Sequence, residues 1–309
     1  MPRDKRPIRR IACVGEVMIE LVTREGDAAT IGAAGDTYNT AVYLARALRG
    51  GDAAISYVTA LGQDPYSERI LAAMRGHGID TGHVERREER IPGLYAIDTD
   101  AEGERSFTYW RGESAARTLF EPPCTVPVEA LDGFDLVLLS GITMAILPPA
   151  MRARVIGWAE TFCANGGTLA YDSNHRPRLW EAPDAARDIN DAMWARADIA
   201  LPSVDDEMAI HGERSESSVL ARLGRLGVRR GALKRGAAGP LDLATATVPA
   251  NLPKVEEVVD STAAGDSFNA GFLAAVVSGR SDLDAARAGH LLASRVIRHR
   301  GAIIPGEGA

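Results

Sequence analysis

Short apolar runs alternate with longer amphipathic segments along most of this chain. The apolar runs have the length and composition of buried strands, and they occur at 11–14, 55–60, 136–140, 168–172, 199–201 and 231–234. The amphipathic segments carry Ala, Leu, Arg and Glu at helical spacing, at 38–49, 66–77, 149–164, 185–196 and 217–226, and two more helices are expected at 266–278 and 282–298. This alternation favours an α/β protein whose parallel sheet carries helices on both faces.

One region departs from the alternation. Residues 83–112 contain two segments of period two around the turn-forming sequence at 98–103, which predicts a β-hairpin. Its strands carry aromatic side chains, namely Tyr95, Phe107, Tyr109 and Trp110. Together with the segment at about 15–35, the hairpin (about 88–113) is expected to form a small β lid over the ligand crevice of the sheet.

Length, composition and net charge favour a single-domain globular protein and argue against nucleic-acid and membrane partners. The chain has 309 residues and shows no linker or repeat, so we expect a basic leader over 1–10 and one domain over 11–309. A net charge of −7 argues against a nucleic-acid binder, and positive groups for an anionic substrate must therefore be gathered locally. No signal peptide or membrane span follows the leader, and the three cysteines lack metal-ligand spacing. We therefore expect a cytoplasmic protein with reduced thiols and no membrane partner.

The sequence DSTAAGDSFNAG at 260–271 places small residues directly before an apolar helix. The free N–H groups in the first turn of a helix form an anion site, and small residues let a ligand approach the backbone. Asp266 in that turn has two explanations. It is a helix cap favoured by the helix dipole, or it is a base beside a transferred phosphoryl group. No GxxxxGK[ST] motif is present, so a P-loop is excluded.

Three other segments carry polar side chains at predicted element ends. Asp36 and Asn39 lie in the first turn of a predicted helix, after a glycine-rich turn. They are either simple helix caps or hydrogen-bond partners of sugar hydroxyls. Arg111 follows an aromatic strand and suits either a carboxylate ligand or a surface stacking role. Asn174 and Arg176 follow a strand at the sheet edge where α/β proteins bind ligands, whereas His175 has no partner at metal-ligand spacing.

In their order along the chain, these segments resemble the PfkB (ribokinase-like) family of small-molecule kinases from about Ile11 to Pro305. The family signature D-[ST]-T-[GA]-A-G-D-x-F-x-x-G matches 260–271. The family's glycine pair before a helix is Ala34-Gly35 here, so the first glycine is replaced. The segments at 15–21, 107–116, 172–180 and 301–305 are most similar to 2-keto-3-deoxygluconate kinases. The resemblance implies a three-layer α/β/α sandwich with a mostly parallel central sheet and a small β lid.

The resemblance also implies roles for single residues. Asp266 would be the catalytic base, and the N–H groups of Ala263, Ala264 and Gly265 would form an anion hole. Residues that would hold the sugar acid, with both arginines on its carboxylate, are Gly35, Asp36, Asn39, Tyr95, Tyr109, Arg111 and Arg176. Residues that would hold ATP are Asn174, Ser203, Lys234, Gly236, Gly239 and Gly265.

One segment departs from the family pattern. The family's N-x-x-E element has Ser203 at the Asn position and Asp206 at the Glu position, with Glu207 as an alternative one residue on. An acidic side chain is retained, so Mg²⁺ is expected to bind there through water, and a monovalent cation is a further candidate. The resemblance also suggests a homo-oligomer, with the lid strands as a candidate interface.

The implied reaction is ATP-dependent phosphorylation of the 6-hydroxyl of 2-keto-3-deoxygluconate. Other sugars are alternatives on the same fold: 2-keto-3-deoxygalactonate, 5-dehydro-2-deoxygluconate and fructose. Two arginines disfavour fructose, which has no carboxylate. A non-catalytic sugar-acid sensor is an alternative of another class, although Asp266 and Gly265 are intact. A Rossmann dehydrogenase is disfavoured because no GxGxxG follows the first strand.

Overall fold

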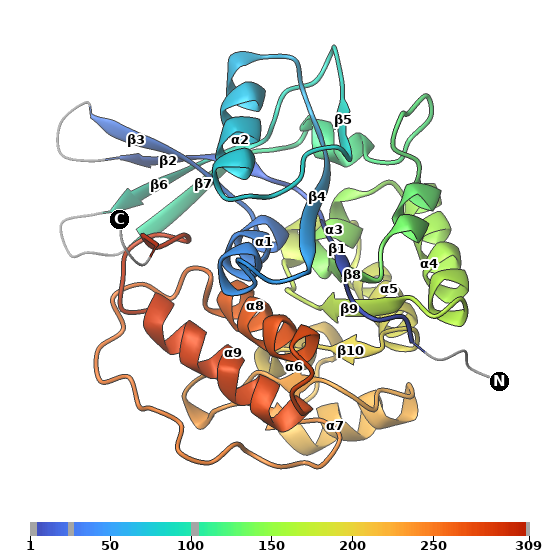
Figure 1. The fold of residues 1–309 in the computed structure, drawn as a ribbon, viewed down its shortest axis with the longest axis vertical. Helices are drawn as coiled ribbons and strands as arrows, with labels where there is room; N and C mark the ends of the chain where they lie inside the picture. Colours follow the sequence, from blue (N-terminus) through green and yellow to red (C-terminus); the bar gives the residue numbers. More distant parts are fainter. Residues whose placement is uncertain (1–4, 24–27, 100–104, 307–309) are drawn as a thin grey trace.

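A six-stranded parallel sheet forms the centre of the protein in the computed structural model, which describes residues 5–23, 28–99 and 105–306 (Figure 1). The strand order is β10-β9-β8-β1-β4-β5, and each neighbouring pair is parallel. The strands are β1 (Arg10–Val14), β4 (Ala54–Leu61), β5 (Val84–Arg86), β8 (Leu136–Ser140), β9 (Thr168–Asp172) and β10 (Ile199–Ala200). The predicted parallel α/β sheet is confirmed.

Helices cover both faces of the sheet. One face packs against α1 (Asp36–Ala47), α2 (Pro65–Gly76), α8 (Ala264–Val277) and α9 (Asp282–Val296). The other packs against α4 (Pro149–Ala164), α5 (Pro183–Trp194) and α7 (Glu216–Arg225). The structure also contains two short helices that the periodicity did not predict, α3 (Gly141–Ile146) and α6 (Val204–His211). Short 3₁₀ segments occur at η1 (Ala115–Thr118), η2 (Val128–Gly133), η3 (Pro177–Leu179) and η4 (Gly236–Ala238). None of the helices in the described part of the chain combines the length and apolar character that a membrane span requires.

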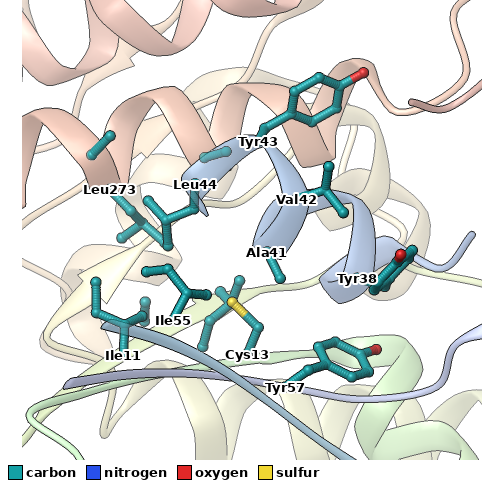
Figure 2. Packing of buried hydrophobic residues seen from close by; sticks show 14 of the residues in the cluster. Ile11, Cys13, Tyr38, Ala41, Val42, Tyr43, Leu44, Ile55, Tyr57 and Leu273 are labelled. Atoms are coloured by element: carbon teal, nitrogen blue, oxygen red, sulfur yellow. The ribbon is translucent and has the colours of Figure 1, made fainter. Parts of the chain in front are cut away.

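The central strands explain why the apolar runs are continuous. In β1, Ile11 and Cys13 point into the core on the α1 side, whereas Ala12 and Val14 point into the core on the α4 side. Side chains of a strand alternate between faces, so a strand buried on both faces must be apolar at every position. Figure 2 shows Ile11 and Cys13 beneath α1, with Leu273 of α8 completing the layer.

Helix starts follow capping chemistry that can be found in the sequence. Asp64 precedes α2, and its Oδ1 accepts hydrogen bonds from the N–H groups of Tyr66 (2.9 Å) and Ser67 (3.1 Å), while Pro65 occupies the first helical position. Ser281 caps α9 in the same way by accepting from the N–H of Asp284 at 3.2 Å. These caps satisfy donors that have no partner inside the helix.

A second, four-stranded sheet stands beside the main one (Figure 1), in the order β3-β2-β6-β7. Its strands are β2 (Met18–Thr23), β3 (Ala29–Ala34), β6 (Leu94–Thr99) and β7 (Arg105–Trp110). β6 and β7 are antiparallel and form the predicted hairpin, although residues 100–103 of its turn lie outside the described residues. We call this element the small sheet.

Some boundaries differ from those expected. Residues 84–86, placed by sequence in the hairpin region, instead pair with β4 as the edge strand of the main sheet. The strand expected at 231–234 is shorter, β11 (Ala232–Leu233), and pairs with β12 (Leu241–Asp242). The expected leader is in part attached to the domain, because Lys5 donates to the carbonyl of Gly167 at 2.6 Å; residues 1–4 lie outside the described residues. The cysteines are unpaired, as expected.

Helices α8 and α9 approach closely at a glycine. A Cβ at Gly271 would lie 2.8 Å from the carbonyl oxygen of Ala288 and 2.9 Å from the Cα of Gly289. Because backbone atoms cannot move aside as a flexible side chain can, this contact fixes α8 against α9. Since α8 carries the 260–271 sequence at its N-terminus, the packing also fixes the start of that helix.

We predict that Gly271→Ala destabilises the protein by about 1–3 kcal/mol, because the added methyl forces the two helices apart. The matched control is Gly224→Ala in α7, where nothing lies within 4 Å of the new Cβ. That change should stabilise the protein by up to about 1 kcal/mol through helix propensity. Urea unfolding measures both, and equal effects of the two substitutions would contradict the packing argument.

Candidate active site

Three carboxylates meet at the carboxyl edge of the main sheet. Asp36 is the first residue of α1, Asp172 is the last residue of β9, and Asp266 lies in the first turn of α8. All three line one small recess, together with Ser140 and other residues. Ligands of open α/β sheets bind at this edge, so the structure brings the sequence-predicted Asp36 and Asp266 together where a ligand is expected.

The side chain of Asp266 is held by α1. Its Oδ2 accepts a hydrogen bond from Nδ2 of Asn39 at 2.8 Å, and its carbonyl oxygen accepts one from Oγ1 of Thr40 at 3.1 Å. Among the described residues, no backbone N–H of α8 donates a hydrogen bond to the carboxylate of Asp266. Of the two explanations that the sequence left open, the structure therefore does not support a simple helix cap.

The protonation of Asp266 is tuned by its surroundings. Burial raises the pKa of Asp266 to about 8; the nearby Asp36 and Asp172 also raise it, whereas the hydrogen bond from Asn39 and the charge of Lys234 lower it. Part of the residue is still open to solvent. A partly accessible carboxyl group with a pKa near neutrality is suited to accept a proton from a bound hydroxyl.

Asp172 is the centre of a buried polar network. Its Oδ2 accepts hydrogen bonds from Nζ of Lys234 at 2.7 Å and from Nδ2 of Asn269 at 2.6 Å. Its Oδ1 accepts the backbone N–H of Asn174 at 3.1 Å. The network ties the end of β9 to the residue after β11 and to the second turn of α8. The predicted nucleotide residue Lys234 is thereby fixed beside the recess.

The turn before α8 exposes backbone donors. Ala263 precedes the helix in the left-handed conformation, with φ of 60°. Of the three N–H groups expected in an anion hole, that of Ala264 already donates to the carbonyl of Ser261 at 3.2 Å. The N–H groups of Ala263 and Gly265 have no acceptor within the described ranges. Free N–H groups at the positive end of a helix attract an anion.

The predicted sugar-acid residues on the small sheet form a second group. Arg111 forms a buried ion pair with Glu16, which sequence analysis did not assign a role. The Tyr95 hydroxyl donates to a carboxylate oxygen of Glu20, and its ring stacks on that of Tyr109 with 5.7 Å between the ring centroids. The guanidinium of Arg111 is therefore held in place, with an aromatic pair on the strands that precede it.

Gly35 connects this group to Asp266. A Cβ at Gly35 would lie 2.2 Å from the carbonyl oxygen of Glu16, so only glycine fits there. The Gly35 N–H approaches Oδ1 of Asn39 at 3.4 Å, and Asn39 in turn holds Asp266. Arg176 is not part of this chain of contacts. It is exposed and donates to the carbonyl of His175 at 2.8 Å.

The expected nucleotide residues come from several separate segments of the chain. Gly236 and Gly239 have φ of 54° and 79°, a region that favours glycine, and they bracket the short turn η4. Ser203 precedes α6 and pairs with Lys234 through a β-bridge. Asn174 is turned toward the start of α1, because its Nδ2 donates to Oδ2 of Asp36 at 3.0 Å.

The two acidic candidates for metal binding differ. Glu207 is fully buried, accepts hydrogen bonds from Arg222 (2.8 Å) and Trp194 (3.2 Å), and is committed to this internal cluster. The expectation of a metal contact from Glu207 is therefore not supported. Asp206 is partly exposed, and burial together with the charge of Asp172 raises its pKa. Within the described residues no three acidic, His or Cys side chains are grouped as metal ligands.

Several partners of the site were not predicted from the sequence. Asp172 ends an apolar strand and Asn269 interrupts an apolar helix, so both were visible as polar exceptions in buried elements. Glu16 and Thr40 had no such signal, because their partners lie far away in sequence.

Comparison with known proteins places this geometry in a family. The family model described as pfkB family carbohydrate kinase matches residues 8–307. The chain belongs to the pfkB family of carbohydrate kinases. It is 44% identical over 305 residues to the 2-dehydro-3-deoxygluconokinase of Escherichia coli (strain K12), and 45% identical to that of Dickeya dadantii (strain 3937). Each match covers 97% of this chain and 98% of the relative.

Solved structures of other sugar kinases share the fold. A PfkB protein from Polaromonas sp. JS666 matches with a TM-score of 0.80 at 24% identity, over 94% of this chain and 96% of that one. Aminoimidazole riboside kinase from Salmonella enterica, solved with aminoimidazole riboside and an ATP analog, gives 0.78 at 20% identity over 96% of each chain. Ribokinase from Thermotoga maritima gives 0.75 at 22% identity over 97% of each. The ribokinase-like fold is thereby confirmed.

Because the pKa of Asp266 is raised, we predict how the free energy of unfolding of this carbohydrate kinase depends on pH. The unfolded chain releases this proton near pH 3.8, whereas the folded protein keeps it to about pH 8. The contribution of Asp266 to stability is therefore present in full at low pH and is lost as the pH rises through 8. Asp266→Asn should remove that loss, so the variant gains stability relative to the wild type between pH 6 and pH 9.

Urea unfolding at the two pH values measures this gain. The control is Asp52→Asn, an exposed carboxylate that should show no such difference. The same difference in both variants would contradict the assignment.

Proposed function

We propose that the protein transfers the γ-phosphoryl group of ATP to the 6-hydroxyl of 2-keto-3-deoxygluconate, giving the 6-phosphate and ADP. The observation that carries the proposal is the chain of contacts from the half-buried Arg111 through the buried Glu16, Gly35 and Asn39 to Asp266. A sugar acid has a carboxylate for Arg111 at one end and a hydroxyl for Asp266 at the other. The names of the relatives with 44–45% identity support this substrate.

Each group then has a chemical task. Asp266 accepts the proton of the hydroxyl as its oxygen attacks the phosphoryl group, which passes to the sugar. The free N–H groups of Ala263 and Gly265 and the ammonium of Lys234 oppose the negative charge that develops on that group. Phosphoryl transfer depends on such positioning and charge stabilisation more than on covalent chemistry.

The nucleotide and metal assignments belong to this proposal. The Salmonella kinase that was solved with an ATP analog shares the fold, which supports ATP as the phosphoryl donor. We assign ATP to the Gly236–Gly239 turn from the resemblance of this segment to the family. Mg²⁺ would neutralise charge on the phosphates, and Asp206 fits a water-mediated contact because magnesium usually needs only one or two carboxylates in addition to phosphate oxygens. A monovalent cation and an oligomer that uses the exposed lid aromatics Phe107 and Trp110 stay predictions.

The small sheet would act as a lid. It carries Tyr95, Tyr109 and Arg111 at the site, so closure over the sugar would exclude water that otherwise accepts the phosphoryl group. The epimeric 2-keto-3-deoxygalactonate presents the same carboxylate. A coupled ADP-release assay over both epimers, 5-dehydro-2-deoxygluconate, fructose and ribose tests the proposal. A preference for fructose or ribose over the acids would overturn it.

We predict that Asp266→Asn lowers kcat by about 10²–10⁴-fold, because the amide cannot accept the hydroxyl proton. ATP binding should be largely unchanged, since Asp266 is expected on the sugar side of the transferred group. The coupled assay gives kcat, and isothermal titration calorimetry gives the affinity for ATP. Near-normal turnover in the variant would exclude Asp266 as the base.

We predict that Arg111→Lys and Arg176→Ala raise KM for the sugar acid by about 10- to 100-fold, the range expected for a lost charged hydrogen bond. Lysine at 111 keeps a positive charge beside the buried Glu16, so the fold is preserved. The control is Arg178→Ala, an exposed arginine on the same loop. Unchanged KM in both site variants would contradict the proposal that these arginines bind the carboxylate of the sugar acid.

A further inference from the structure

An ion pair connects the small sheet to the turn that precedes α8. Arg105, the first residue of β7, pairs with the carboxylate of Asp260, and its Nη1 also donates to Oγ1 of Thr262 at 3.1 Å. Asp260 is only 7% exposed. An exposed ion pair contributes little, but this one has a buried acid and a second hydrogen bond that fixes the guanidinium.

Asp260 organises the backbone around it. Its Oδ1 accepts the N–H of Thr262 at 3.0 Å, and its Oδ2 accepts the N–H of Gly301 at 2.7 Å. One carboxylate therefore holds three parts of the chain: the small sheet through Arg105, the turn before α8, and the segment after α9. Removal of Arg105 leaves the two backbone contacts in place but releases the small sheet.

The position of Thr262 matters because it directly precedes Ala263. Ala263 is held in a left-handed conformation, which is unfavourable for a residue other than glycine, and it orients the N–H groups that follow. A shift of Thr262 would therefore move the donors of Ala263 and Gly265 away from a bound anion.

We propose that Arg105 is a positioning residue that couples closure of the small sheet to the geometry of these N–H donors. With the small sheet in the position seen in the structure, Arg105 holds Thr262, and the donors are aligned. With the sheet displaced, the ion pair is broken and the donors lose one of their constraints. The alignment that stabilises the transferred group is thus complete only when the sugar is covered. This inference rests on the proposed kinase reaction.

The experiment compares Arg105→Ala and Arg105→Lys with a matched control. The control is Arg90→Ala, because Arg90 precedes β6 and pairs with the exposed Glu113, so it removes an ion pair beside the same sheet that does not touch the α8 turn. We expect Arg105→Ala to lower kcat about 10- to 100-fold, since small misplacements of catalytic groups have effects of this size. KM for the sugar acid should change by less than about 3-fold, because the proposed contact of Arg111 with the carboxylate of the sugar acid is intact.

Arg105→Lys should recover part of kcat, and Arg90→Ala should behave as the wild type. Hydrogen–deuterium exchange of the peptide covering 260–266 is measured in the same proteins without substrate, and we expect faster exchange in Arg105→Ala only. Unchanged exchange in Arg105→Ala overturns the proposal, as does faster exchange with unchanged kcat or an equal loss of kcat in the control.

The exchange measurement separates this inference from the proposed function. If the wild type phosphorylates another sugar of the panel, the substrate assignment fails, and kcat for that sugar tests Arg105 in the same way. If the wild type is inactive on the whole panel, the catalytic part of the inference fails together with the proposed function, whatever the exchange result.

Discussion

The negative charge of the recess is the constraint on which the rest of the site depends. Asp36, Asp172 and Asp266 share one small space, and like charges at short range oppose ionisation. Burial, together with this repulsion, raises the pKa of Asp266 to about 8, and the hydrogen bond from Asn39 and the ammonium of Lys234 offset only part of that rise. The same charges that help to raise the pKa of Asp266 would repel an anionic ligand.

In the proposed binding mode, the anionic groups of the ligands avoid this repulsion because they bind away from the three carboxylates. A sugar acid would bring its carboxylate to Arg111, on the small sheet, and would present only a neutral hydroxyl to Asp266. The phosphoryl group would meet the free N–H donors at the start of α8, where the helix dipole is positive. Since the whole protein has a net charge of −7, these local groups must supply all of the attraction.

Sequence patterns predicted the parts of this structure that depend on local rules. The buried strands are apolar at most positions, α2 and α9 begin at capping residues, and the 260–271 sequence located Asp266. Pairings across the chain could not be predicted in this way. Arg111 with Glu16 spans 95 residues and Arg105 with Thr262 spans 157, and neither leaves a periodic signal. Glu207 is an example of a misleading sequence signal. It was a candidate for metal binding, but in the structure it forms an internal ion pair with Arg222.

These long-range pairs explain why the small sheet cannot be treated as a separate flap. Arg111 reaches back to the end of β1 through Glu16, and Arg105 reaches to the turn before α8 through Asp260. The sheet is therefore attached at both ends of the site, at the sugar-acid side and at the phosphoryl side. Arg105 begins β7 and Arg111 directly follows it, so a displacement of that strand would change both ends together. In the proposed mechanism, binding of the sugar and alignment of the donors are then parts of a single movement.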